Sequence, residues 1–155
     1  MPHCVILYTP NVDRLTDMTA LCRALADAML TIRDEAGRQV FPTGGTRVLA
    51  YPAAHYAVAD GQGDYAFVYV NVRMGAGRSE AVQKHAGDTL LAVAKQHFAP
   101  VLERQLIGIT LQIDESPGQV YDGKLSTLHP LFAPVIPAQA GIQSTGSPGV
   151  PPPRG

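Results

Sequence analysis

The sequence predicts an α/β (α+β) domain in which two β-α-β units share one four-stranded sheet, with two helices on one of its faces. Two observations lead to this prediction. The order strand, helix, strand occurs twice between residues 4 and 114, and a long helical crossover requires the two strands of its unit to run parallel, with a right-handed connection. The central strand is apolar in both of its alternating sets of side chains, which is typical of a strand covered on both faces.

The elements of the first unit follow from residue spacing. Residues 4–8 (CVILY) form a short apolar run and predict a strand. A helix is expected after a capping position at Thr16 or Asp17, because apolar side chains then recur every three or four positions up to Ile32. Residues 47–51 predict a short strand, and the proline that follows places it at an edge of the sheet.

The second unit shows the same order of elements. Residues 65–72 (YAFVYVNV) are almost all β-branched or aromatic, which favours a buried strand. Ser79 is a good helix cap, and an apolar stripe at helical spacing follows it. Residues 107–114 alternate between apolar and polar side chains, as a half-buried strand does. A small hairpin is expected at 120–125, followed by a last apolar segment that could dock on a neighbour.

The number of helices leaves part of this sheet without a cover. Two helices can cover one face of a four-stranded sheet, yet the central strand at 65–72 is apolar on both faces. An apolar sheet face that the chain itself does not cover usually marks an interface. The sequence therefore predicts a homo-oligomer that packs sheet against sheet.

The end of the chain differs in composition from the rest. Residues 134–155 contain six prolines and four glycines, one charged side chain and no aromatic residue. Such a segment cannot bury enough apolar surface to offset the entropy lost on ordering. We therefore expect one domain at residues 2–133 and a disordered Pro/Gly-rich tail at 134–155 that carries no chemistry.

Composition excludes several classes of function. The net charge is −1 and no basic cluster is present, so nothing predicts nucleic-acid binding. Cys4 and Cys22 form neither a disulfide framework nor a metal-binding pattern, and both are expected to be buried thiols. No signal peptide is visible and no apolar run approaches membrane-spanning length, so we expect a cytoplasmic protein without a membrane partner or a metal.

One candidate site follows the central strand. Gly75 and Gly77 allow a tight turn, and Ser79 then begins a helix whose free N–H groups favour anions. Arg78 adds a guanidinium whose geometry matches a carboxylate or a phosphate. The alternative is a glycine turn beside a solvated arginine. The segment GAGR is not a nucleotide-binding motif.

A second candidate is the amino terminus. Initiator methionine is usually removed before a small residue, which would leave Pro2 as the first residue, with a secondary amine. Terminal amines titrate near neutrality, at about 7.7–8.0, and burial or nearby cations lower that value. Pro2 is therefore a candidate general base, although many proteins begin with Met-Pro without catalytic meaning.

Several segments together resemble one family, the 5-carboxymethyl-2-hydroxymuconate delta-isomerases of the tautomerase superfamily. They are Pro2-His3, FPTGGTR at 41–47, ADGQGDYAFVYVNVRMGAGRS at 59–79 and AGDTLLAVAKQHF at 86–98. The resemblance covers about residues 2–132. It implies a tautomerase-like fold of two fused β-α-β units, a homotrimer, no cofactor, and a pathway that degrades homoprotocatechuate, an aromatic acid.

The resemblance also implies roles for individual residues. Pro2 would be the catalytic base, and Arg47 and Arg78 would bind the carboxylates of a polycarboxylate dienol substrate, with Arg78 also stabilising developing charge. His3 is expected to have a structural role beside the first strand. Two alternatives remain open: a tautomerase-superfamily enzyme for a different enol or halogenated acid, and a non-catalytic trimer that binds a small anion.

Overall fold

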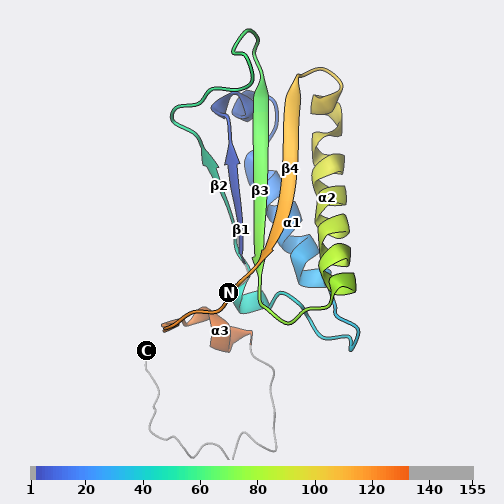
Figure 1. Cartoon of the computed structure of the whole chain (residues 1–155), viewed down its shortest axis with the longest axis vertical. Coiled ribbons are helices and arrows are strands. Elements are labelled where there is room, and N and C mark those ends of the chain that lie inside the picture. The colour runs from blue at the N-terminus through green and yellow to red at the C-terminus, as the bar shows by residue number, and fades with distance from the viewer. Residues whose placement is uncertain (1–2, 133–155) are drawn as a thin grey trace, which may run out of the picture.

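A single mixed sheet organises the chain (Figure 1). The computed structural model describes residues 3–132, so Pro2 and the expected tail at 134–155 lie outside the described residues. The elements are β1 (His3–Tyr8), η1 (Pro10–Arg14), α1 (Met18–Thr31), η2 (Thr43–Gly45), β2 (Val48–Pro52), β3 (Ala66–Met74), α2 (Glu80–Leu102), β4 (Ile107–Glu115) and α3 (Leu128–Leu131).

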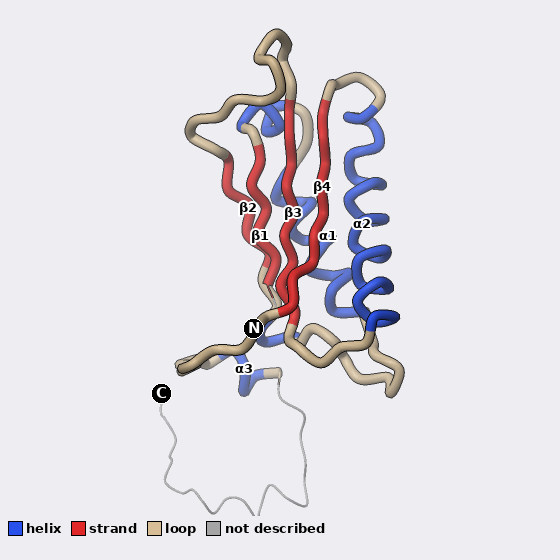
Figure 2. The backbone as a smooth tube through the Cα atoms, viewed as in Figure 1, coloured by secondary structure: helices blue, strands red, loops and turns tan. Residues whose placement is uncertain are grey.

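The sheet confirms the predicted pair of β-α-β units. Its strand order is β2-β1-β3-β4, with β1 parallel to β2, β3 parallel to β4, and β1 antiparallel to β3. Strand β2 lies at an edge, as the sequence predicted, and ends at Pro52, one residue later than expected (Figure 2). This topology has one consequence for function: β1 and β2 begin, and β3 and β4 end, at the same end of the sheet.

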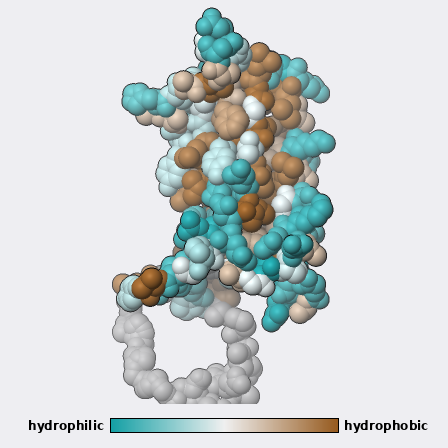
Figure 3. Space-filling model, in the orientation of Figure 1, coloured by the Kyte–Doolittle hydropathy of each residue, from teal (hydrophilic) through white to brown (hydrophobic). Residues whose placement is uncertain are grey.

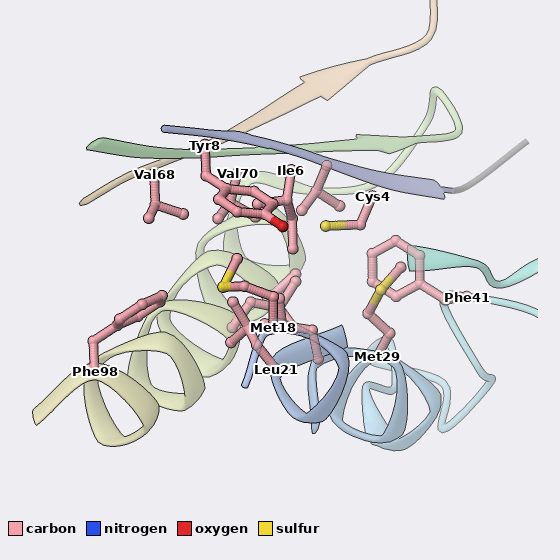
Figure 4. Packing of buried hydrophobic residues seen from close by; sticks show 14 of the residues in the cluster. Cys4, Ile6, Tyr8, Met18, Leu21, Met29, Phe41, Val68, Val70 and Phe98 are labelled. Carbon is pink, nitrogen blue, oxygen red and sulfur yellow. The ribbon is translucent and has the colours of Figure 1, made fainter. Parts of the chain in front are cut away.

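Helices α1 and α2 cover one face of the sheet; in Figure 1, α1 is seen behind the strands and α2 beside β4. Alternate residues of β3, from Ala66 to Met74, point into this layer and are buried, because side chains alternate along a strand. Figure 4 shows side chains of β1 and β3 pointing toward the helices, where Met29 and Phe98 meet them. The core therefore lies between the sheet and the two helices.

The opposite face of the sheet is open in the single chain. Leu7 is 48% exposed, Tyr51 50% and Phe67 38%. Hydrophobic side chains gather over this face in the space-filling view (Figure 3). The second apolar set of β3 is therefore not covered by this chain, and an open face of this kind is typical of an interface.

The structure differs from the sequence prediction in two segments. The hairpin expected at 120–125 does not form: residues 119–127 carry no strand, and Tyr121 and Leu125 are exposed. Helix α1 ends at Thr31, one residue before Ile32, the last apolar position of the periodicity that predicted it. No helix within residues 3–132 is long and apolar enough to cross a membrane.

The caps of both long helices agree with the sequence. Asp17, one of the two candidates, caps α1 by accepting hydrogen bonds from the Thr19 and Ala20 amides. Ser79 caps α2, and its Oγ accepts from the Val82 amide at 3.2 Å. Each cap satisfies amide groups that the first turn of a helix leaves unpaired.

Candidate active site

The candidate site lies at the end of the sheet where β1 and β2 begin. Arg47 directly precedes β2, and its carbonyl oxygen accepts a hydrogen bond from the Cys4 amide of β1 at 2.9 Å. The glycine turn that leads to Arg78 follows β3 at the same end. Pro2 itself lies outside the described residues, but His3, the next residue, opens β1 here. The topology thus gathers the two predicted arginines and the start of the first strand.

The turn between β3 and α2 has the conformation that its glycines predict. Gly77 has a φ of +96°, in the left-handed region that residues with a Cβ rarely adopt. Its amide donates to Glu115 Oε2 at 3.1 Å, which ties the turn to the end of β4. Ser79 then caps α2 and also donates its hydroxyl to Glu35 Oε2 at 2.5 Å. The hydrogen bond from Ser79 lowers the pKa of Glu35.

Carboxylates of the protein itself therefore occupy part of the anion-binding corner expected at the start of α2. Glu115 accepts from the turn, and Glu35 accepts from the cap. A helix N-terminus attracts negative charge, which explains why two acidic side chains from distant segments lie here. A substrate carboxylate at this corner would depend on Arg78 more than on the helix amides.

Arg78 is anchored by the segment that connects α1 to β2. Its Nη2 donates to the Val40 carbonyl oxygen at 3.1 Å, and its Nη1 lies 3.8 Å from Asp34 Oδ2. The side chain is 29% exposed. Its Nε is buried and has no hydrogen-bond partner among residues 3–132. Arg78 is therefore an anchored side chain and not the solvated arginine of the alternative interpretation.

Asp34 is itself fixed by its own turn. Its Oδ1 accepts from the amides of Arg38 and Ala36, both at 2.9 Å. These hydrogen bonds hold the pKa of Asp34 below its ordinary value, and the one from the Arg38 amide has the largest effect. The positive charges of Arg38 and Arg78 lower this pKa further. The sequence does not mark Asp34 as a residue of the site, because no motif includes it.

Arg47 lies in more open surroundings than Arg78. Its side chain is exposed, and Nη1 donates to the Gly45 carbonyl oxygen at 3.1 Å. It lines a hollow of about 430 Å³ between the η2 turn and residues 123–129. Arg78 is not among the residues that line this hollow. The two arginines share one end of the sheet, but each has its own set of neighbours.

Three further side chains have surroundings typical of structural residues. His97 is half-buried on α2, within 2.9 Å of Thr16 Oγ1, and burial lowers its pKa. Cys4 is buried, and burial raises its pKa to about 12. Cys22, which was also expected to be buried, is only half-buried, and this partial burial raises its pKa as well. Within residues 3–132, no group of three or more His, Cys, Asp or Glu side chains could hold a metal ion.

Comparisons with known proteins agree on one family. A family model described as 5-carboxymethyl-2-hydroxymuconate isomerase matches residues 2–132. The Escherichia coli 5-carboxymethyl-2-hydroxymuconate Delta-isomerase is 30% identical over 132 residues, which cover 85% of this chain and 99% of that protein.

Solved structures lead to the same family. The crystal structure of a 5-carboxymethyl-2-hydroxymuconate delta-isomerase is 57% identical, with a TM-score of 0.82, over 88% of this chain and 95% of that one. A 5-carboxymethyl-2-hydroxymuconate isomerase from Deinococcus radiodurans R1 is 32% identical, with a TM-score of 0.74, over 86% and 95% of the two chains. The fold implied by the sequence resemblance is thereby confirmed.

Proposed function

The chain belongs to the 5-carboxymethyl-2-hydroxymuconate isomerase family, and from this premise we propose that it converts 5-carboxymethyl-2-hydroxymuconate to its 2-oxo-3-ene isomer. The reaction would serve the catabolism of homoprotocatechuate. The observation that carries the proposal is the family match over residues 2–132. The position of Arg47 and Arg78 at the end of the sheet where β1 begins supports it.

The proposed base is the amine of Pro2, exposed by removal of Met1. It would take the proton of the substrate's 2-hydroxyl group, which leaves a dienolate with charge spread along the conjugated carbons. The protonated amine would then return that proton to the carbon at the far end of the diene, which gives the 2-oxo-3-ene product. One group performs both steps if it keeps the proton between them, so the reaction needs no cofactor or redox partner.

The two arginines would provide the electrostatics. Negative charge develops on the 2-oxygen and the adjoining carboxylate, and a guanidinium already fixed in place stabilises it without reorganisation. The anchoring of Arg78 by Val40 and Asp34 supports such a role. Arg47, beside the start of β1, would hold another substrate carboxylate. Cations near a terminal amine also lower its pKa, which leaves a larger fraction of free base at neutral pH.

The proposed assembly is a homotrimer. The open apolar face of the sheet, with Leu7, Tyr51 and Phe67 exposed, supports an assembly that covers it. We further propose that residues 2–133 form the catalytic domain and that 134–155 are dispensable. Light scattering of the full chain and of a chain that ends at residue 133 tests both points. Both chains should have three times the monomer mass and equal activity. A monomeric but active chain would contradict the assembly.

The test of the function is ultraviolet-monitored conversion of 5-carboxymethyl-2-hydroxymuconate by protein shown by mass to lack Met1. Conversion should vanish in Pro2→Ala and weaken in Arg47→Ala. The matched control is Lys95→Ala, which removes an exposed cation from α2 and should leave the rate unchanged. Absence of conversion by trimmed, trimeric protein would overturn the substrate assignment. A screen of other enols and halogenated acids would then test the alternative within the superfamily.

A further inference from the structure

The hollow beside Arg47 has a second wall, formed by the segment between β4 and the end of the described chain. Lys124, Ser126 and His129 line it from this segment, and Thr46 and Arg47 line it from the η2 side. The lining contains two cations and no Asp or Glu. A hollow with this charge balance favours an anion.

The two walls are in direct contact. A Cβ placed on Gly44 would lie 2.9 Å from the Cα of His129, so only glycine allows the α3 backbone to approach η2 this closely. The neighbouring atoms are backbone atoms, which cannot move aside as a flexible side chain can. The position of His129 relative to Arg47 is therefore set by the packing of α3 on η2.

The hydrogen bonds around Ser126 favour one tautomer of neutral His129. Ser126 Oγ accepts from the amides of Leu128 and His129, both at 3.1 Å, and lies 2.7 Å from His129 Nδ1. Because a hydroxyl oxygen has two acceptor lone pairs and both are engaged, its proton is directed to Nδ1. Neutral His129 then carries its own proton on Nε2, which makes Nε2 a hydrogen-bond donor.

Lys124 forms an ion pair with a neighbouring carboxylate at the edge of the hollow. Its Nζ lies 2.7 Å from Asp122 Oδ2, and the Lys124 side chain is 42% exposed. The hydrogen bond and the charge of Lys124 lower the pKa of Asp122. An ion pair this exposed is weak, so the ammonium group remains able to bind a second anion.

We propose that this hollow is a carboxylate subsite in which Lys124 and the Nε2–H of His129 bind one carboxylate of the substrate, beside the carboxylate that Arg47 binds. The inference rests on the proposed function and deepens it. The proposed substrate carries three carboxylates, two on its muconate chain and one on its carboxymethyl arm, whereas the two arginines account for two. Lys124 supplies a cation and His129 a hydrogen-bond donor for the third carboxylate. An acid with three carboxylates should therefore bind more tightly than an acid with two.

Titration calorimetry with unreactive acids tests the subsite without turnover. The probes are tricarballylate, with three carboxylates, and glutarate, with two. We expect Lys124→Ala to weaken tricarballylate binding about 5-fold, the upper end of the range for an exposed charge pair, and to leave glutarate binding unchanged. His129→Ala should weaken tricarballylate binding, and His129→Gln, whose amide keeps a donor, should restore it. Lys95→Ala is the matched control for charge.

Two further variants separate charge from shape. Asp122→Asn frees the ammonium of Lys124 and should tighten tricarballylate binding, which a merely structural role of this segment would not produce. Gly44→Ala displaces His129 and should weaken binding, although it removes no charge. Melting curves of all variants establish that they are folded. Unchanged tricarballylate affinity in both Lys124→Ala and His129→Ala would overturn the subsite.

Turnover measurements keep the two proposals distinct. If the enzyme isomerises the proposed substrate but KM is unchanged in Lys124→Ala, the subsite is wrong and the proposed function stands. If binding of tricarballylate depends on Lys124 and His129 but no isomerisation occurs, the subsite stands and the proposed function is wrong.

Discussion

Replacing Arg78 with alanine separates a catalytic from a structural role of this residue. The change removes the donor to the Val40 carbonyl oxygen and the cation beside Asp34. A purely structural arginine would lower the stability of the folded chain and leave the rate of the folded enzyme unchanged. An arginine that stabilises developing charge would lower the rate by far more than any loss of folded protein explains.

The magnitudes of the two effects differ enough to be distinguished. A hydrogen bond from a charged donor such as the Arg78 guanidinium contributes about 1.5–3 kcal/mol to the free energy of unfolding. Domains of this size are stable by about 5–15 kcal/mol, so such a loss leaves the chain folded. Removal of a donor that stabilises an oxyanion costs about 100- to 1,000-fold in kcat, or about 3–4 kcal/mol. A rate loss of that size therefore cannot come from unfolding.

The assay pairs steady-state isomerisation at 25 °C with urea unfolding of the same samples. We expect kcat/KM of Arg78→Ala to fall at least 100-fold. Arg78→Lys keeps the charge but lacks the planar fork, so it cannot donate to Val40 and hold a carboxylate in the same way. Its kcat/KM should therefore lie between that of the unaltered chain and that of Arg78→Ala. If Arg78→Ala lowers the unfolding free energy yet keeps kcat/KM within threefold of the unaltered chain, Arg78 is an anchor for the 34–40 segment and our reasoning is wrong.

Three other predictions concern the fold. Phe98 is fully buried, so Phe98→Ala should lower the unfolding free energy by about 3–5 kcal/mol in urea titrations; a loss below 1 kcal/mol would contradict this packing. Because burial raises the pKa of Cys4 to about 12, iodoacetamide at pH 8 should leave Cys4 unmodified until denaturant is added, as intact mass and peptide mapping will show. Hydrogen bonds from Asn11 and Arg14 lower the pKa of Asp64 below 3.8, so its contribution to stability is complete above pH 3.8 and is lost as the pH falls through the lower, folded-state pKa. Asp64→Asn should therefore flatten the dependence of the urea midpoint on pH between 5 and 2, and an unchanged slope would refute the assignment.

Periodicity in the sequence was sufficient to predict the sheet and its two covering helices. The alternating pattern of β3 and the capping residue Ser79 depend on neighbours within a few positions, and such local signals survive in the folded chain. The surroundings of Arg78 could not be predicted in this way. Its acceptor Val40 is 38 residues away in the chain, and no spacing rule relates the two positions.

The hairpin predicted at 120–125 shows the limit of turn chemistry. Asp122-Gly123 is a favourable turn sequence, but an isolated two-stranded hairpin is marginal in water without a third strand or a helix to pack against. The structure offers neither: Tyr121 and Leu125 are exposed, and Asp122 pairs with Lys124 instead of closing a turn. The sequence also contains no sign that this segment lines the Arg47 hollow, because no pattern marks Lys124 or His129 as ligand-binding residues.

Two glycines at this end of the sheet, Gly44 and Gly77, are required for different structural reasons. Gly77 is required for its backbone conformation, since its φ of +96° excludes most other residues. Gly44 has an ordinary backbone and is required for space, because its missing Cβ admits the α3 backbone at His129. Both look alike in the sequence, as glycines in turns. Gly77 is explained by its own turn, whereas Gly44 is required by a segment about 85 residues later in the chain. We therefore expect Gly44→Ala to weaken ligand binding beside Arg47, and Gly77→Ala to disturb the start of α2.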